Sequence, residues 1–208
     1  MNALDPPVLE GRHVQLVPLR HEHAPLLLRA ANESRATYAF TLVPSDLAGM
    51  QAYIASALLE QEAGLSLPFA VRDGSGVVVG STRFMAIEWW DWPGAPAEPV
   101  PPGPDAMEIG YTWYAERVQR TALNTEAKLL LCTHAFEHWR VRRMTWKTDG
   151  RNARSRAAIL RLGALFDGVL RANRAAADGE VRDTAFYSML ASEWPQARRG
   201  LERRLARD

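Results

Sequence analysis

The stretch QRTALNTEAKLL, residues 119–130, begins as a polar loop and continues as an apolar, helix-favouring run. It follows MEIGYTWY, residues 107–114, whose β-favouring composition predicts a strand. At a junction of strand, loop and helix, backbone N–H groups and the helix dipole create a binding site for anions. Residues 119–124 have the spacing of a pyrophosphate-binding loop, with Ala122 and Asn124 in positions where small glycines are usual. The stretch therefore raises the question of whether it binds phosphate.

Two readings of this stretch remain open from the residues alone. In the first, Ala122 lets a phosphate approach the backbone, and Asn124 tolerates a left-handed conformation better than other non-glycine residues. In the second, the stretch is an ordinary helix start with Asn124 or Thr125 as the N-cap. Glu126 weighs against phosphate, because a carboxylate in the first turn competes for the same helix dipole.

The composition bounds the class of protein. With 208 residues, 47% of them hydrophobic and 24% charged, the chain is expected to fold as one domain with a sizeable core. A net charge of +1 gives no overall attraction for nucleic acid or for anionic membranes. The one cysteine, Cys132, excludes an intramolecular disulfide and suits a reducing compartment. We find no secretory signal or transmembrane run, and we expect a cytoplasmic protein without nucleic-acid or membrane partners.

The pattern along the chain predicts strands alternating with helices. Residues 88–106, rich in Trp and Pro, are expected to form an exposed insertion. The order of elements predicts a single α/β (α+β) domain, 1–208, with a mixed sheet and helices on its faces. Strands are expected at residues 12–19, 67–73, 77–88, 107–114, 142–149, 164–171 and 181–190. Helices are expected at residues 21–32, after Ser45-Asp46, and at residues 123–139, 152–163 and 192–207. The last of these helices is strongly basic.

A second polar cluster lies in residues 140–161. This segment carries eight basic residues and one acidic residue, although the whole chain is close to neutral. The asymmetry suits a phosphorylated ligand, and it equally suits a solvated helix face. Asn152 and Ser155 share one helical stripe with the apolar Ile159 and Leu162. These two polar side chains therefore either cap the helix or meet a polar group at its N-terminal end.

Together these segments resemble the GNAT N-acetyltransferase superfamily, and within it the ribosomal-protein-alanine N-acetyltransferase-like (RimJ/RimL-like) branch. The resemblance runs from Leu9 to Pro195, and residues 108–168 are its specific part. It implies a mostly antiparallel sheet that is splayed at the cofactor site, acetyl-CoA as cosubstrate, and no metal. The implied acceptor is a primary amine, either a protein N-terminus (a ribosomal protein among them) or a small molecule. The alternative is a domain that binds acyl-CoA without turnover, and a homodimer is compatible with either.

The resemblance also implies positions for the acyl donor. The pantetheine arm would pair with the main chain of the strand, and the pyrophosphate would lie on the amides of the following loop. Two further positions match residues beside the pantetheine. The implied cofactor residues are Tyr111, Thr112 and Trp113 on the strand, Gln119, Thr121, Ala122, Leu123, Asn124 and Thr125 in the loop, and Asn152 and Ser155 at the next helix.

Two residues are implied as catalytic. Glu108 matches the acidic position that deprotonates the amine, directly or through water; its alternative is an ion pair at a strand edge. Ser155 matches a serine near the sulfur, where a hydrogen bond would stabilise the leaving thiolate. The tyrosine that many members place seven residues after the Asn is Ile159 here. Tyr187 is a further polar candidate, or simply a core tyrosine.

The segment HAFEH, residues 134–138, fits the H-x-x-E-H pattern of some zinc sites. The surrounding helix is otherwise a packing helix, and no third ligand can be placed from the sequence. We therefore expect no metal here.

Overall fold

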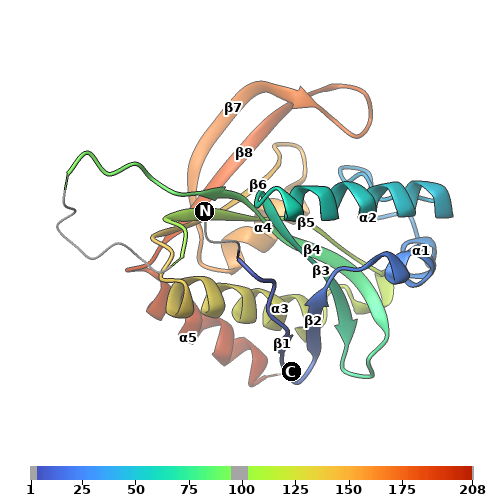
Figure 1. Ribbon diagram of the computed structural model, residues 1–208, viewed down its shortest axis with the longest axis horizontal. Coiled ribbons are helices and arrows are strands. Elements are labelled where there is room, and N and C mark those ends of the chain that lie inside the picture. Colours follow the sequence, from blue (N-terminus) through green and yellow to red (C-terminus); the bar gives the residue numbers. More distant parts are fainter. Residues whose placement is uncertain (1–3, 95–102, 208) are drawn as a thin grey trace.

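The computed structural model describes residues 4–94 and 103–207 (Figure 1). One eight-stranded sheet has the order β1-β2-β3-β4-β5-β6-β8-β7. All neighbouring strands are antiparallel except β5 and β6, which are parallel. The strands are β1 (Leu9–Glu10), β2 (Val14–Pro18), β3 (Ser66–Asp73), β4 (Val78–Glu88), β5 (Ala106–Tyr114), β6 (Arg143–Asp149), β7 (Leu165–Ala175) and β8 (Val181–Leu190).

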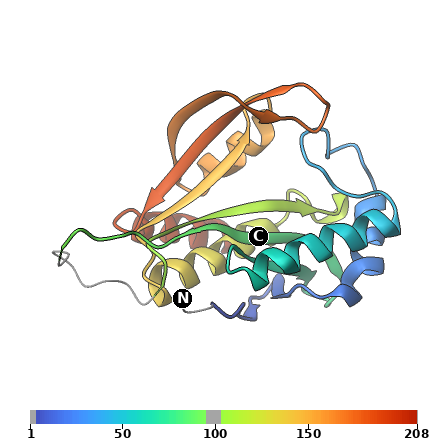
Figure 2. The ribbon, with the colours of Figure 1, turned by 45° about the horizontal axis from the view of Figure 1, so that its top comes forward.

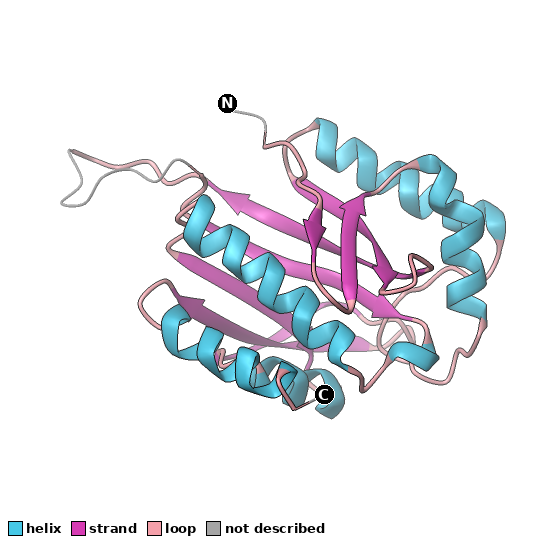
Figure 3. Ribbon diagram, turned by 90° about the horizontal axis from the view of Figure 1, so that it is seen from below, coloured by secondary structure: helices cyan, strands magenta, loops and turns pink. Residues whose placement is uncertain are grey.

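Helices cover both faces of this sheet. In Figure 1, α2 lies above the sheet, whereas α3 and α5 lie below it; α3 and α5 face the viewer in Figure 3. The predicted fold class, a single α/β domain with a mixed sheet, is confirmed, and the predicted order of elements is recovered with β1 as an extra short strand. The helices are η1 (His21–His23), α1 (Ala24–Asn32), α2 (Leu47–Glu62), η2 (Glu116–Val118), α3 (Ala122–Thr133), the π-helical turn η3 (His134–His138), α4 (Ala153–Arg161) and α5 (Trp194–Leu205).

Local signals explain most of these boundaries. Asp46 caps α2, because its carboxylate accepts a hydrogen bond from the Gly49 N–H at 2.8 Å. Pro25 lies in the first turn of α1, where its missing N–H is not needed. Gly76, with φ of 84°, makes the turn between β3 and β4, and Gly163, with φ of 96°, follows the end of α4.

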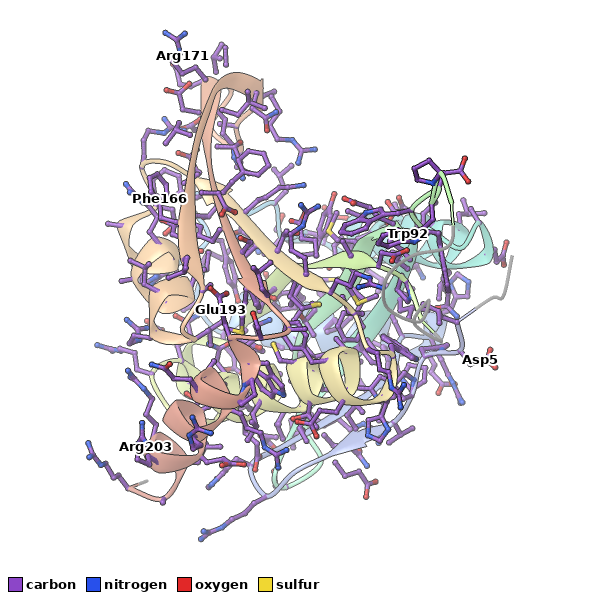
Figure 4. All side chains as sticks on the ribbon, turned by 90° about the vertical axis from the view of Figure 1, so that its left-hand side faces the viewer. Asp5, Trp92, Phe166, Arg171, Glu193 and Arg203 are labelled. Atoms are coloured by element: carbon purple, nitrogen blue, oxygen red, sulfur yellow. The ribbon has the colours of Figure 1, made fainter. Side chains whose placement is uncertain are left out.

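The connection between β4 and β5 contains the Trp/Pro-rich segment, of which residues 95–102 lie outside the described part. The Trp90 and Trp92 rings are 5.8 Å apart, and the Arg142 guanidinium lies 4.8 Å from the Trp92 ring. The Asp105 carboxylate accepts hydrogen bonds from the Trp90 N–H and from Arg142 Nε. The described part of this segment therefore packs beside the start of β6. Figure 4 places Trp92 on the other side of the molecule from Arg171 on the β7–β8 hairpin.

None of the helices in the described part of the chain is both long enough and apolar enough to cross a membrane.

A carboxylate of α3 fixes the N-terminal hairpin. Glu126 is buried, and its oxygens accept hydrogen bonds from the backbone N–H groups of Arg12 at 2.9 Å and His13 at 2.5 Å. The backbone of Gly11 approaches so closely that a Cβ there would lie 2.5 Å from Glu126 Cδ. The β1–β2 turn is therefore attached to the same helix that follows the predicted phosphate loop.

We expect Glu126→Gln to lower the free energy of unfolding by about 1 to 3 kcal/mol. An amide keeps one acceptor oxygen but places an NH₂ group opposite a backbone N–H, which leaves that buried donor unpaired. The measurement is urea unfolding. Glu62→Gln, at the exposed end of α2, is the matched control and should change stability by less than about 0.5 kcal/mol. Equal effects of the two substitutions would contradict this role of Glu126.

Candidate active site

The two parallel strands at the centre of the sheet separate after a short contact. Their pairing covers only residues 106–108 of β5 and residues 143–145 of β6. Beyond it, β5 continues to Tyr114 and β6 to Asp149 with no pairing between them. Figure 2 shows β6 and β8 tilting away from β5. The edge of β5 that faces this gap therefore has main-chain groups without a strand partner, and a ligand with amide groups can pair with them.

Two helices begin at the open end of the gap, because β5 leads into α3 and β6 leads into α4. Thr121 caps α3 through a 3.3 Å hydrogen bond from the Leu123 N–H to its hydroxyl. Asn152 caps α4 through a 3.0 Å bond from the Ser155 N–H to its side-chain oxygen. Both helix N-termini thus lie at the carboxyl ends of the parallel strands, where their dipoles favour an anion.

The observed start of α3 corrects the sequence analysis. The N-cap is Thr121, not Asn124 or Thr125, because Thr121 has the extended backbone that an N-cap needs. Asn124 and Thr125 are already helical. The left-handed residue of the loop is Arg120, with φ of 62°, so Asn124 does not take the conformation that was expected of it. The loop makes its turn two residues before Ala122, the first position that glycine would occupy.

The expectation that Glu126 competes with an anion was also wrong. Its carboxylate lies on the flank of α3 that faces the β1–β2 turn, where it is bonded to two backbone N–H groups. Glu126 is the fifth residue of α3, beyond its first turn, and the flank that it occupies was not visible from sequence. The N-terminus of α3 is therefore free of that competing charge.

The α1–α2 connection bridges the two sides of the gap. The Tyr38 hydroxyl donates to the Tyr114 carbonyl at 2.9 Å, and burial raises the pKa of Tyr38 to about 12. The Gln119 amide donates to that carbonyl at 2.8 Å and to the Thr37 hydroxyl at 2.9 Å. From α4, an Arg154 NH₂ group donates to the Thr37 carbonyl at 2.7 Å. The Gln119 side chain thus links the loop to the α1–α2 connection, and only its backbone is left to bind a ligand.

A β-bulge interrupts β5 beside the gap. Ser81 pairs with Trp113 and Arg83 pairs with Gly110, so Thr82 alone faces Tyr111 and Thr112. Tyr111 adopts φ of 49°, which is a strained conformation for a residue with a Cβ. The strand edge therefore turns at the position where the acyl chain of the donor was expected to lie.

Lys128, a buried residue of α3 behind this bulge, was not expected from the sequence to take part in the site. Its Nζ donates to the Thr112 hydroxyl at 2.7 Å and lies 3.2 Å from the Thr82 hydroxyl. Burial lowers the pKa of Lys128 to about 7 and raises the pKa of the neighbouring Cys132 to about 12. The available signal was a lysine inside the apolar run of an amphipathic helix.

Glu108 lies where the β5–β6 pairing ends. It is buried, and its Oε2 is 2.8 Å from Nζ of the more exposed Lys147. A Cβ on Gly110 would lie 2.5 Å from Met85 Sδ and 3.3 Å from Glu108 Oε1, so glycine makes room for this carboxylate. The ion pair that the sequence allowed is therefore present, and the carboxylate is at the closed end of the gap. Ser155, the other catalytic candidate, is half-buried in the first turn of α4.

The predicted cofactor residues lie in β5, in the loop and first turn of α3, and at the start of α4. Tyr111 is exposed, Thr112 is half-buried and Trp113 is buried in β5, with Tyr38 edge-on to the Trp113 ring. Thr121, Ala122 and Leu123 line one side of a hollow of about 410 Å³ that Arg12, His13, Asp73 and Gly74 also line. Tyr187 is buried in β8 and accepts a 2.9 Å hydrogen bond from Arg156 Nε, so it packs on the α4 side and not in the gap.

The HAFEH segment does not converge on a metal site. Glu137 accepts hydrogen bonds from Trp194 Nε1 and Arg198, both in α5, at 2.8 Å. The His134 and His138 rings pack against each other at 5.1 Å, and burial lowers the pKa of His134 to about 4. Over residues 4–94 and 103–207, no group of three His, Cys, Asp or Glu side chains could hold a metal ion.

Comparison with known proteins identifies the family. A family model described as acetyltransferase (GNAT) domain matches residues 13–165. The chain belongs to the GNAT acetyltransferases. Among curated proteins, none matches this sequence. The solved structure of a GCN5-related N-acetyltransferase from Brucella melitensis is 28% identical, covers 98% of this chain and 87% of its own, and superposes with a TM-score of 0.83.

Two further GNAT structures share the fold and contain coenzyme A. Mycobacterium smegmatis RimJ in complex with CoA-disulfide is 21% identical, covers 96% of this chain and 95% of its own, and has a TM-score of 0.75. RimL, a ribosomal L7/L12 α-N-protein acetyltransferase in complex with coenzyme A, is 19% identical, covers 89% and 97%, and has a TM-score of 0.70. At these identities the likeness to RimJ and RimL concerns the fold.

We expect Lys128→Met to stabilise the protein most at low pH. Below pH 7 both folded and unfolded chains carry the lysine proton, so the free-energy cost of burying the charge is fully present. Between pH 7 and 10.5 only the unfolded chain is protonated, so this cost disappears as pH rises. The difference in unfolding free energy, variant minus wild type, should fall by a few kcal/mol, on the order of 1.4 per pKa unit, between pH 6.5 and pH 10.

The control for this measurement is Leu131→Met, a buried change in the same helix that alters no titrating group. Its difference from wild type should be constant over the same pH range. A constant difference for Lys128→Met as well would contradict a lowered pKa.

Proposed function

We propose that this GNAT protein transfers an acetyl group from acetyl-CoA directly to a primary amine. The observation that carries the proposal is the separation of β5 from β6, which leaves a strand edge free beside two helix N-termini. The pantetheine arm would pair with the main chain of Tyr111 to Tyr114, and the pyrophosphate would lie on the amides of residues 119–125. Asn152 and Ser155 would border the arm from α4.

The chain's own groups suit the chemistry of direct transfer. A bond forms between the amine nitrogen and the thioester carbon, the carbon–sulfur bond breaks, and the thiolate leaves with a hydrogen bond or a proton. Glu108 would take the proton of the amine, directly or through water, with Lys147 Nζ 2.8 Å from its Oε2. Ser155 would donate a hydrogen bond to the sulfur.

The acceptor is proposed as a primary amine of a protein N-terminus or of a small molecule. RimL is a ribosomal-protein α-N-acetyltransferase, and this supports including ribosomal N-terminal peptides among the acceptors to test. The single, buried cysteine and the near-neutral charge support a cytoplasmic location.

The deciding experiment combines acetyl-CoA titration by calorimetry with thiol release over a panel of amines. The panel contains N-terminal peptides, amino acids, polyamines and aminoglycosides. Acetyl-CoA binding together with thiol release on one class supports the proposal and names the acceptor class. Binding without thiol release on any amine would instead favour a non-catalytic acyl-CoA sensor.

Asn124→Asp should affect stability and binding in opposite directions. A carboxylate in the first turn of α3 interacts favourably with the helix dipole, which should raise the free energy of unfolding by about 0.3 to 1 kcal/mol. The same charge would repel the pyrophosphate, and calorimetry should show acetyl-CoA affinity reduced by about tenfold. Asn173→Asp, an exposed change in β7, is the matched control. Unchanged affinity in the Asn124 variant would show that this loop is not the phosphate site.

Glu108→Gln and Lys147→Met should separate a catalytic carboxylate from a structural ion pair. If Glu108 is the base, Glu108→Gln should lower kcat by about 100-fold or more. Lys147→Met should keep kcat within about threefold of wild type, because the carboxylate that takes the proton is retained. Equal losses of activity in both variants would leave Glu108 as an ion-pair residue.

A further inference from the structure

Burying the Lys128 amine in the core costs folding free energy. It is 4% exposed, it lies in α3 among the apolar residues of the core, and its pKa is lowered to about 7 by burial. A methionine would fill this space without a desolvation penalty. Because the Lys128 side chain is almost fully buried, recognition of a soluble partner does not explain it. Its contacts within the protein must therefore explain why an amine is there.

These contacts form a closed ring of three polar groups. Lys128 Nζ is 2.7 Å from the Thr112 hydroxyl and 3.2 Å from the Thr82 hydroxyl, and the two hydroxyls are 2.8 Å apart. Thr82 is the residue of β4 that faces the bulge, and Thr112 is one of the two bulge residues of β5. The ring thus joins α3 to both strands at the bulge.

The bulge is also held from the opposite face of the sheet. The Tyr111 ring lies 4.0 Å from the guanidinium of Arg83, which is 2% exposed and forms a 3.0 Å ion pair with Glu60 of α2. A left-handed residue with a Cβ costs about 1 to 2 kcal/mol, so it persists only where its surroundings enforce it. Arg83 holds Tyr111 from one side, and Lys128 holds Thr112 from the other.

We propose that Lys128 is a positioning residue that fixes the β5 bulge and thereby aims the main chain of Tyr111 and Thr112 at the reacting end of the acyl donor. The inference rests on the proposed function, in which the donor lies along this edge. The pyrophosphate would be held in the following loop, at residues 119–125, and not by the three groups of the ring. Loss of the ring should therefore disturb the alignment of the thioester more than the affinity for acetyl-CoA.

The kinetic test compares Lys128→Met with Leu131→Met, a buried substitution on the same helix that leaves the ring intact. Lys128→Met should lower kcat by about 10- to 100-fold and change the KM for acetyl-CoA by less than about threefold. Leu131→Met should leave both within about twofold. Equal losses in the two variants, or an unchanged kcat in Lys128→Met, would overturn the proposal.

Thr112 provides a test on the other end of the bond. Thr112→Val removes the hydroxyl and should lower kcat as Lys128→Met does, whereas Thr112→Ser keeps the hydroxyl and should restore at least about a third of wild-type kcat. The double variant Lys128→Met/Thr112→Val should lose little more than either single variant, because both break the bond between Lys128 and Thr112. Additive losses of kcat in the double variant, or no recovery of kcat in Thr112→Ser, would contradict the role of this ring in positioning the bulge.

A readout that needs no turnover separates this inference from the proposed function. Amide hydrogen exchange of residues 110–113 should be about tenfold faster in Lys128→Met than in wild type, and unchanged in Leu131→Met. Unchanged exchange in Lys128→Met would overturn the positioning role even in an active enzyme. A wild-type protein that releases no thiol on any amine would overturn the proposed function, and the exchange result would still decide whether Lys128 fixes the bulge.

Discussion

The parallel contact between β5 and β6 is the constraint on which the rest of the molecule depends. It is short, covering residues 106–108 and 143–145, and every other strand pair in the sheet is antiparallel. A parallel pair requires a crossover, and α3 supplies it, so the helix N-terminus must lie at the end where the strands separate. The backbone topology alone therefore places the strand edge, the loop and the helix N-terminus together, whatever the side chains are.

Side chains around the gap fix the segments that border it, while the β5 edge itself keeps main-chain groups without a strand partner. Tyr38 and Gln119 both donate to the Tyr114 carbonyl, Thr121 and Asn152 cap the two helices, and Lys128 holds the bulge from behind. These contacts come from segments far apart in the chain, including the α1–α2 connection. The free edge is consequently a rigid surface, which suits a site that must align a thioester with an amine.

The sequence predicts those features of the structure that depend on a few neighbouring residues, and it does not predict contacts between distant segments. Asp46 and Asn152 mark helix starts, and Gly76 marks a hairpin turn, because a cap or a positive φ involves only a few neighbouring residues. The order of the elements follows from such signals. Lys128 and Glu126 were not interpretable in this way, because their roles depend on which flank of α3 they occupy and on the strands packed there. Lys147 was likewise invisible as the partner of Glu108 until the parallel pairing brought them together. Thr121 was missed as the cap because α3 starts three residues earlier than a cap at Asn124 implies.

The contact between Gly11 and Glu126 has a consequence for the evolution of this chain. A Cβ at position 11 would overlap the carboxylate, and the carboxylate is what satisfies the two amides that follow Gly11. A side chain at position 11 would therefore force the carboxylate to shift, and losing the carboxylate alone leaves the two amides without this acceptor. The two positions are expected to change together or not at all, so an alignment of relatives should show them as a coupled pair despite their separation along the chain.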